Sequence, residues 1–108
     1  MIMKFSEIKF SEHGQGGDHA VLKFKNNYGL SIARTANTYG GASGKYEAAL
    51  LNFHGDGPDD WDIVYNDSLG FSDVKGWLTE KEIEDEVFLI SSAEGHKGDS
   101  KEIGWKDE

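Results

Sequence analysis

Residues 28–53 constrain the fold more than any other stretch, because they contain two strand patterns joined by a glycine-rich connection. Within residues 28–34, Leu30 and Ile32 alternate with small or polar residues, which indicates a strand with one buried face. Residues 45–53 are apolar on both faces toward their end, which suits a central strand. The glycines between them permit backbone conformations closed to other residues. We therefore expect an antiparallel hairpin with a long connection, onto which the other elements dock.

Residues 2–10 are expected to form a strand at the start of the chain, because apolar and polar residues alternate there. Phe5 and Phe10 occupy equivalent positions in a five-residue echo within this segment. They would fall on opposite faces of a strand, so we interpret the echo as coincidence.

Two further strands are expected at residues 20–25 and 61–65. In the first, alternation places Leu22 and Phe24 inward, and the following Asn26-Asn27 pair favours a turn. In the second strand, alternation places Trp61, Ile63 and Tyr65 on one face. Residues 66–76 show no regular pattern and are expected to be irregular.

The clearest helix signal begins at Thr79. Thr79 and Glu82 have the spacing of a capping box, in which each side chain accepts a hydrogen bond from the other residue's backbone N–H. Leu78 and Ile83 complete a hydrophobic staple around this cap. The stripe expected to pack on the sheet consists of Ile83, Val87 and Ile90. Residues 87–90 also suit a strand by composition, so the end of the helix stays open.

These elements predict an α+β fold: an antiparallel meander sheet of four or five strands with one C-terminal helix packed on one face. The 108-residue chain has room for one domain, expected over residues 1–92. Residues 93–108 form a polar tail that is expected to be flexible, with Ile103 and Trp105 as its sizeable apolar groups. Packing of Trp105 against the body is the alternative.

The formal net charge of −9 is concentrated in the second half of the chain, since residues 1–53 sum to +2 and residues 54–108 to −11. This balance argues against direct binding of nucleic acid, which depends on Lys and Arg contacts to phosphate. No run approaches the ~18 apolar residues of a membrane span. The chain has no cysteine, which fits a reducing compartment. We expect a cytoplasmic protein whose partner has a basic surface.

The loop that contains Tyr39, Gly40, Gly41, Gly44 and Tyr46 is a candidate ligand contact. It fails as a phosphate-binding loop, because Tyr39 stands where the first glycine is needed and Tyr46 where a Ser or Thr would hold magnesium. The simpler interpretation is a tight glycine loop against which the tyrosines pack.

Metal chemistry and catalysis have little support in the sequence, and we expect no cofactor. A metal site at one end of the sheet is conceivable from His13, Asp18, His19 and His54, but nothing in their spacing requires it. The aspartates of residues 56–62 do not follow the calcium-loop pattern. Most polar candidates for catalysis lie on loops without a rigid frame, so we expect a protein that is not an enzyme.

The acidic residues are the remaining functional signal. One loop and one helix face could form a continuous negative surface that docks on a basic protein, with a tryptophan as the anchor. The candidate residues for this surface are Asp56, Asp59, Asp60, Trp61, Asp62, Trp77, Glu80 and Glu84. A solvated face that only keeps the protein soluble is the alternative.

Three ordered motifs support a family resemblance. They are Phe24-Lys25-Asn26-Asn27-Tyr28-Gly29-Leu30-Ser31, then Thr38-Tyr39-Gly40-Gly41-Ala42-Ser43-Gly44-Lys45-Tyr46-Glu47, and finally Gly76-Trp77-Leu78-Thr79-Glu80-Lys81-Glu82-Ile83. Over residues 23–90 the chain resembles a family of small bacteriophage proteins without an assigned activity. It departs from that pattern in the acidic loop of residues 55–62, in residues 1–19 and in the tail. The resemblance implies phage origin and a compact α+β domain, and it carries over no catalytic residue.

We therefore expect a non-enzymatic phage protein that modulates a host protein in the host cytoplasm through its negative surface, in the manner of a DNA mimic. A self-associating virion or structural accessory is one alternative. A ligand-binding or hydrolytic domain that uses the loop from Tyr39 to Tyr46 is another. The sequence does not specify the oligomeric state.

Overall fold

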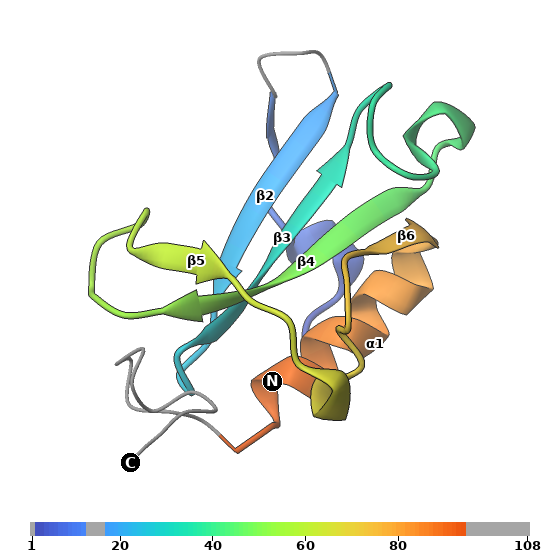
Figure 1. Cartoon of the computed structure of the whole chain (residues 1–108). Coiled ribbons are helices and arrows are strands. Elements are labelled where there is room, and N and C mark those ends of the chain that lie inside the picture. Colours follow the sequence, from blue (N-terminus) through green and yellow to red (C-terminus); the bar gives the residue numbers. More distant parts are fainter. Residues whose placement is uncertain (1, 13–16, 95–108) are drawn as a thin grey trace.

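A six-stranded antiparallel sheet and a single long helix make up the computed structural model, which describes residues 2–12 and 17–94 (Figure 1). The strands are β1 (Ser11–Glu12), β2 (Asp18–Lys23), β3 (Tyr28–Arg34), β4 (Tyr46–Phe53), β5 (Trp61–Ile63) and β6 (Lys75–Leu78). Short 3-10 turns occur at η1 (Phe5–Glu7), η2 (Gly41–Ser43) and η3 (Asp67–Leu69), and the helix is α1 (Glu80–Ser91). This confirms the predicted α+β fold. The expected tail beyond residue 94 lies outside the described residues.

Strand β4 is the centre of the sheet. One of its edges pairs with β3 from Tyr28↔Asn52 to Ala33↔Glu47. The other edge is divided, because β6 pairs near Tyr46 and Ala48 while β5 pairs with the last three residues. Residues 48–53 are all buried, as the apolar pattern on both faces predicted.

The core lies between one face of the sheet and α1. Ile83, Val87 and Ile90 are fully buried, and they pack in one cluster with Leu30 and Ile32 of β3. The predicted stripe is therefore confirmed. The helix also continues through residues 87–90, so the strand alternative for that segment is wrong.

The capping box predicted at the start of α1 is present. Thr79 Oγ1 accepts a hydrogen bond from the Glu82 backbone N–H at 3.2 Å, and Glu82 Oε1 accepts from the Thr79 N–H at 2.9 Å. The hydrogen bonds from Thr79 lower the pKa of the Glu82 carboxyl below its ordinary value. Leu78, the first residue of the predicted staple, is buried.

Substitution Thr79→Ala is expected to lower the free energy of unfolding by about 1 kcal/mol, because the first turn loses a side-chain acceptor. Urea denaturation measures the change. Folding lowers the pKa of the Glu82 carboxyl, so its ionised form stabilises the folded state. This stabilisation is present above the ordinary titration range of glutamate and is lost as the pH falls through the folded pKa. Ser92→Ala at the exposed C-cap is the control and should change little, because within the described residues it is the backbone N–H of Ser92, kept in alanine, that bonds the end of the helix. Equal effects of both substitutions would contradict the role given to Thr79.

A distant side chain closes the other end of α1. Asn26, in the turn between β2 and β3, donates from Nδ2 to the Ile90 carbonyl at 2.7 Å and to the Ala93 carbonyl at 3.0 Å. Its Oδ1 accepts from the Tyr28 N–H at 3.0 Å. The turn predicted from the Asn-Asn pair therefore also fixes the position from which the chain leaves the helix.

The N-terminal segment differs from the predicted strand over residues 2–10. None of residues 2–10 is in a strand, and the first strand, β1, begins only at Ser11. Phe5–Glu7 is instead a 3-10 turn in which Glu7 Oε1 accepts from the Lys4 N–H at 2.8 Å. The turn brings Phe5 and Phe10 to the same side, where both rings contact Tyr46 at centroid distances of 5.1 and 5.7 Å. The expectation that these two rings fall on opposite faces is therefore wrong.

Strand β6 was not predicted, since residues 66–76 were expected to be irregular. It pairs with β4 across a register shift between Tyr46 and Ala48, and its burial does not alternate. Trp77 within it has φ of +61°, an uncommon value for a residue other than glycine. The usual period-two pattern is therefore missing from the sequence.

Candidate protein-binding surface

The acidic loop between β4 and β5 is held by its own hydrogen bonds. The His54 N–H donates to the Asp60 carbonyl at 3.0 Å, and Asp60 Oδ2 accepts from the Gly57 N–H at 3.0 Å. A Cβ at Gly55 or Gly57 would lie 2.5 or 2.9 Å from that same carboxylate oxygen. Asp60 therefore serves to shape the loop, and the two glycines leave room for its side chain.

This loop forms one wall of a groove of about 410 Å³ on the sheet face opposite α1. We call it the outer groove; it is lined by Ser11, His19, Val21, Lys23, Phe53 and residues 56–59. The ring of Phe53 extends from β4 toward β3, since a Cβ on Gly29 would lie 2.6 Å from its Cε1 atom. Val21 and Phe53 were not predicted as site residues, because nothing local in the sequence shows that the loop folds beside β2.

Lys23, the lysine that lines the outer groove, interacts with β4 and with the acidic loop. Lys23 Nζ lies 5.3 Å from the centroid of the Phe53 ring and donates to the Gly55 carbonyl at 3.1 Å. His19 Nε2 is 2.9 Å from the Ser31 hydroxyl on the neighbouring strand. These contacts place polar groups around Val21, which is 37% exposed, whereas the Phe53 ring beside it is buried.

Two carboxylates of the loop stay available. Asp56 and Asp59 are exposed, and neither makes an ion pair with a residue in the described part of the chain. Asp62 on β5 differs, because its Oδ2 lies 3.2 Å from His54 Nε2. The outer groove thus has one exposed apolar side chain, Val21, and a rim with two carboxylates that make no ion pair with the described residues.

The aromatic residues predicted as anchors differ in exposure. Trp61 is half-buried, and its indole N–H is enclosed with no acceptor among the described residues. Beyond it, Ile63 of β5 and Tyr65, two residues after the strand, are 48% and 63% exposed, so this part of the chain presents apolar surface next to the acidic loop. Trp77 is 62% exposed but lies on β6.

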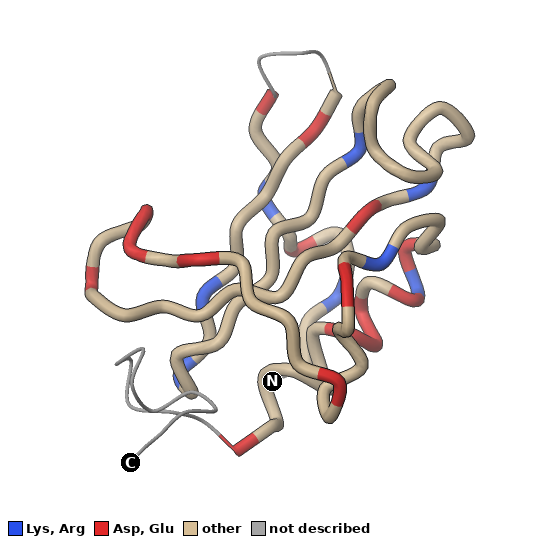
Figure 2. The backbone as a smooth tube through the Cα atoms, viewed as in Figure 1, with Lys and Arg blue, Asp and Glu red and all other residues tan. Residues whose placement is uncertain are grey.

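The predicted negative surface is not continuous. Figure 2 shows the acidic loop at one side of the molecule and the start of α1, with Glu80, at the other. Glu84 is also occupied, because its Oε2 accepts from the Phe5 N–H at 2.6 Å. The structure therefore brings together the candidates of residues 56–62 and separates them from Trp77, Glu80 and Glu84.

The candidate ligand loop is closed on itself. The N–H groups of Gly41, Ser43, Gly44 and Lys45 all donate to carbonyls of residues 38–41, so these amides cannot cradle a phosphate. Gly40 and Gly44 have positive φ, as such a tight loop requires. Tyr39 is 65% exposed, but Tyr46 points into the core, where burial raises the pKa of its hydroxyl. The simpler interpretation from the sequence, in which the tyrosines pack against a tight glycine loop, therefore fits Tyr46.

The conceivable metal ligands do not converge where they are described. Asp18 pairs with Arg34 at 2.8 Å, and His54 faces Asp62. His13 lies outside the described residues. Over residues 2–12 and 17–94, no three His, Asp or Glu side chains gather in an arrangement that could hold a metal ion.

Comparisons of the chain with family models, with curated proteins and with solved structures find no match. Within the described residues, none of the helices has both the length and the apolar character to cross a bilayer.

Proposed function

We propose that the chain is a non-enzymatic binding module that holds a basic, extended segment of another protein in the outer groove. The observation that carries this proposal is that the exposed apolar side chain of Val21 lies in a groove whose rim holds the carboxylates of Asp56 and Asp59, which have no ion-pair partner among the described residues. A segment that alternates apolar and basic residues complements both features. Ile63 and Tyr65 extend the contact surface beyond the acidic loop.

The partner in this proposal is a host protein met by a phage protein in the host cytoplasm. The resemblance to small bacteriophage proteins supports this origin, and the net charge of −9 favours fast encounter with a basic surface. Because the acidic groups of the loop and of α1 lie apart, a DNA-like array of charges is not part of the proposal.

The double substitution Asp56→Asn/Asp59→Asn is expected to weaken binding of a labelled peptide that alternates valine with lysine or arginine. Two rim charges at 0.2–1 kcal/mol each correspond to a loss of about 2- to 30-fold. Fluorescence anisotropy with the full chain measures the affinity at low and high salt. The difference between wild type and variant should shrink at high salt, because exposed charges are screened.

Asp67→Asn/Asp73→Asn is the matched control, since it removes the same charge from exposed residues outside the outer groove. Binding by this variant should stay near that of wild type. An equal loss in both double variants would mean that net charge alone attracts the peptide, and the proposal for the outer groove would fail. Affinity capture from host lysate with wild type against Asp56→Asn/Asp59→Asn then identifies the natural partner.

A further inference from the structure

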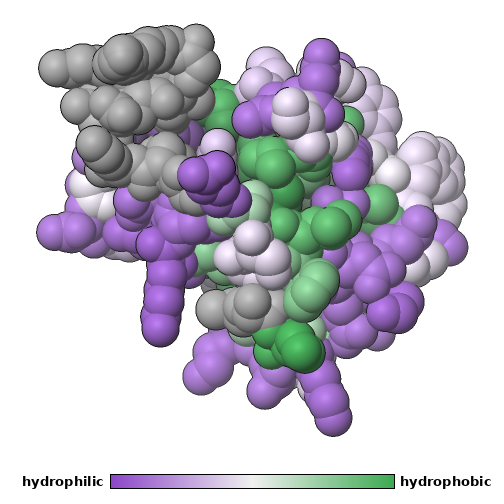
Figure 3. Space-filling view, turned by 90° about the horizontal axis from the view of Figure 1, so that it is seen from below, coloured by the Kyte–Doolittle hydropathy of each residue, from purple (hydrophilic) through white to green (hydrophobic). Residues whose placement is uncertain are grey.

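Two exposed aromatic residues from distant parts of the sequence meet just before the start of α1. The Trp77 backbone N–H donates to the Tyr39 carbonyl at 3.0 Å, and the two residues are 62% and 65% exposed. We call them the aromatic pair. Figure 3 shows a band of hydrophobic residues on the side where α1 ends, whereas the aromatic pair lies where the helix begins. The pair shares no residue with the outer groove, so its role is independent of the proposed function.

The backbone around the aromatic pair is closely fixed. A Cβ at Gly76 would lie 2.3 Å from the Tyr39 Cβ, and a Cβ at Gly40 would lie 2.8 Å from the Trp77 Cα. The loop between β3 and β4 therefore rests directly on β6. Trp77 has φ of +61°, and a bulky residue with such a value carries backbone strain. Its side chain is outside the core, so core packing does not compensate the strain, and strained residues of this kind cluster at binding sites.

The cations of the protein lie over other aromatic rings. Within the described residues, three rings have a cation 4.5, 5.1 and 5.3 Å from the centroid, in the pairs Lys75–Phe71, Arg34–Tyr46 and Lys23–Phe53. In the same part of the chain, neither ring of the aromatic pair has such a cation or contacts another ring. The face of an aromatic ring is negative and attracts cations. The aromatic pair therefore offers two exposed rings to a cation from another molecule.

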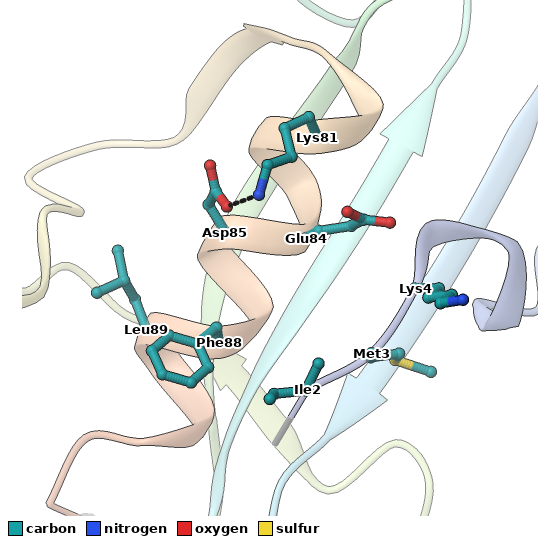
Figure 4. A pocket seen from close by; sticks show the side chains of 8 residues that line it. All are labelled: Ile2, Met3, Lys4, Lys81, Glu84, Asp85, Phe88 and Leu89. Carbon is teal, nitrogen blue, oxygen red and sulfur yellow. Dashed lines mark hydrogen bonds and ion pairs between the residues drawn. The ribbon is translucent and has the colours of Figure 1, made fainter.

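The charged side chains around the aromatic pair also favour a cation. Those within five positions of either residue, or in contact with the loop of Tyr39, are Arg34, Lys45, Glu47, Asp73, Lys75, Glu80, Lys81 and Glu82. Three of the cations are neutralised by ion pairs of 2.7–2.8 Å, which are Arg34–Asp18, Lys75–Glu86 and Lys81–Asp85, the last drawn in Figure 4. The others are four carboxylates and one ammonium, which sum to −3.

We propose that the aromatic pair binds the guanidinium group of an arginine side chain on a partner protein. A guanidinium is planar and weakly hydrated, so it stacks on an aromatic face while its N–H groups reach carboxylates at the edge. An ammonium is more strongly hydrated and loses more on leaving water. A nucleobase also stacks on aromatic rings, but the negative balance around Tyr39 and Trp77 repels its phosphate.

Fluorine NMR of the full chain labelled with 5-fluorotryptophan tests this proposal. The chain contains three tryptophans, and Trp61→Phe and Trp77→Phe assign two of the resonances. The probe is N-acetyl-arginine amide, titrated at constant ionic strength. The Trp77 resonance should shift in a saturable way while the Trp61 resonance stays. N-acetyl-citrulline amide has the same shape without the charge and should cause no saturable shift. An arginine probe without effect, or a citrulline probe with an equal effect, would overturn the proposal.

Tyr39→Ser is expected to weaken binding of the arginine probe by about 2- to 5-fold, the effect of one exposed cation–π contact. Tyr65→Ser is the matched control, because Tyr65 is 63% exposed and lies outside the aromatic pair, so binding should stay unchanged. An equal loss in both variants would contradict the site. Free arginine should bind no more tightly than the capped probe, since tighter binding would point to a free amino acid as the ligand. Preferential binding of adenosine monophosphate would overturn the proposal in favour of nucleic acid.

Discussion

Gly29→Ala is expected to cost about 3 kcal/mol of stability or more, because the new methyl group has no space. A Cβ at this position would lie 2.2 Å from the Leu22 carbonyl oxygen and 2.6 Å from Cε1 of Phe53. Gly29 lies in β3, paired with Lys23 on one side and Leu51 on the other, so the strands must separate to relieve the clash. Thermal and urea denaturation measure the loss.

Gly44→Ala is an informative comparison for this substitution. Gly44 has φ of +80°, and a Cβ added to it would meet no atom within 4 Å, so its replacement causes backbone strain without a clash. We expect about 1 kcal/mol for this change. A Gly29→Ala variant as stable as Gly44→Ala would show that Phe53 and the β2 backbone can move aside.

Lys75→Met is expected to destabilise the fold by about 2–3 kcal/mol, because it leaves the Glu86 carboxylate buried without its cation. Lys75 Nζ lies 2.7 Å from Glu86 Oε2, with the two side chains 30% and 11% exposed. The same ammonium lies 4.5 Å from the centroid of the buried Phe71 ring. This pair joins β6 to α1, and its partial exposure places the expected loss below that of a fully buried pair.

Two comparisons separate the buried charge from other effects of the substitution. Lys81→Met removes the exposed pair with Asp85 and should cost much less than Lys75→Met, because water screens that pair. The double variant Lys75→Met/Glu86→Leu should be more stable than Lys75→Met, because it removes the isolated carboxylate. If Lys75→Met were no worse than Lys81→Met, the pair would contribute no more than a surface contact.

The parts of the fold that the sequence predicted are those whose signals are local. The Thr79 and Glu82 capping box, the Ile83 stripe and the alternation of Leu30 and Ile32 each depend on neighbouring residues. The prediction for the N-terminal segment was wrong because Phe5 and Phe10 are placed by contacts with distant Tyr46. Strand β6 was missed because its pairing is shifted at a bulge.

For the candidate surface, too, the sequence predicted what depends on neighbouring residues and missed what depends on the course of the chain. The acidic residues of 56–62 are adjacent in sequence and stay together in the structure. Their separation from Glu80 and Glu84 follows from the course of β5, η3 and β6 across the sheet, which no local pattern determines. The same is true of the meeting of Val21 with Phe53, since it depends on the register of three strands.

The divided edge of β4 has a consequence for how the molecule opens. The outermost strands, β1 and β5, can detach while the remaining ladders persist, so these margins can fluctuate locally. Opening at β4 instead disrupts its pairing with β3, β5 and β6 at once. Its backbone amides should therefore exchange with solvent only when the whole domain unfolds.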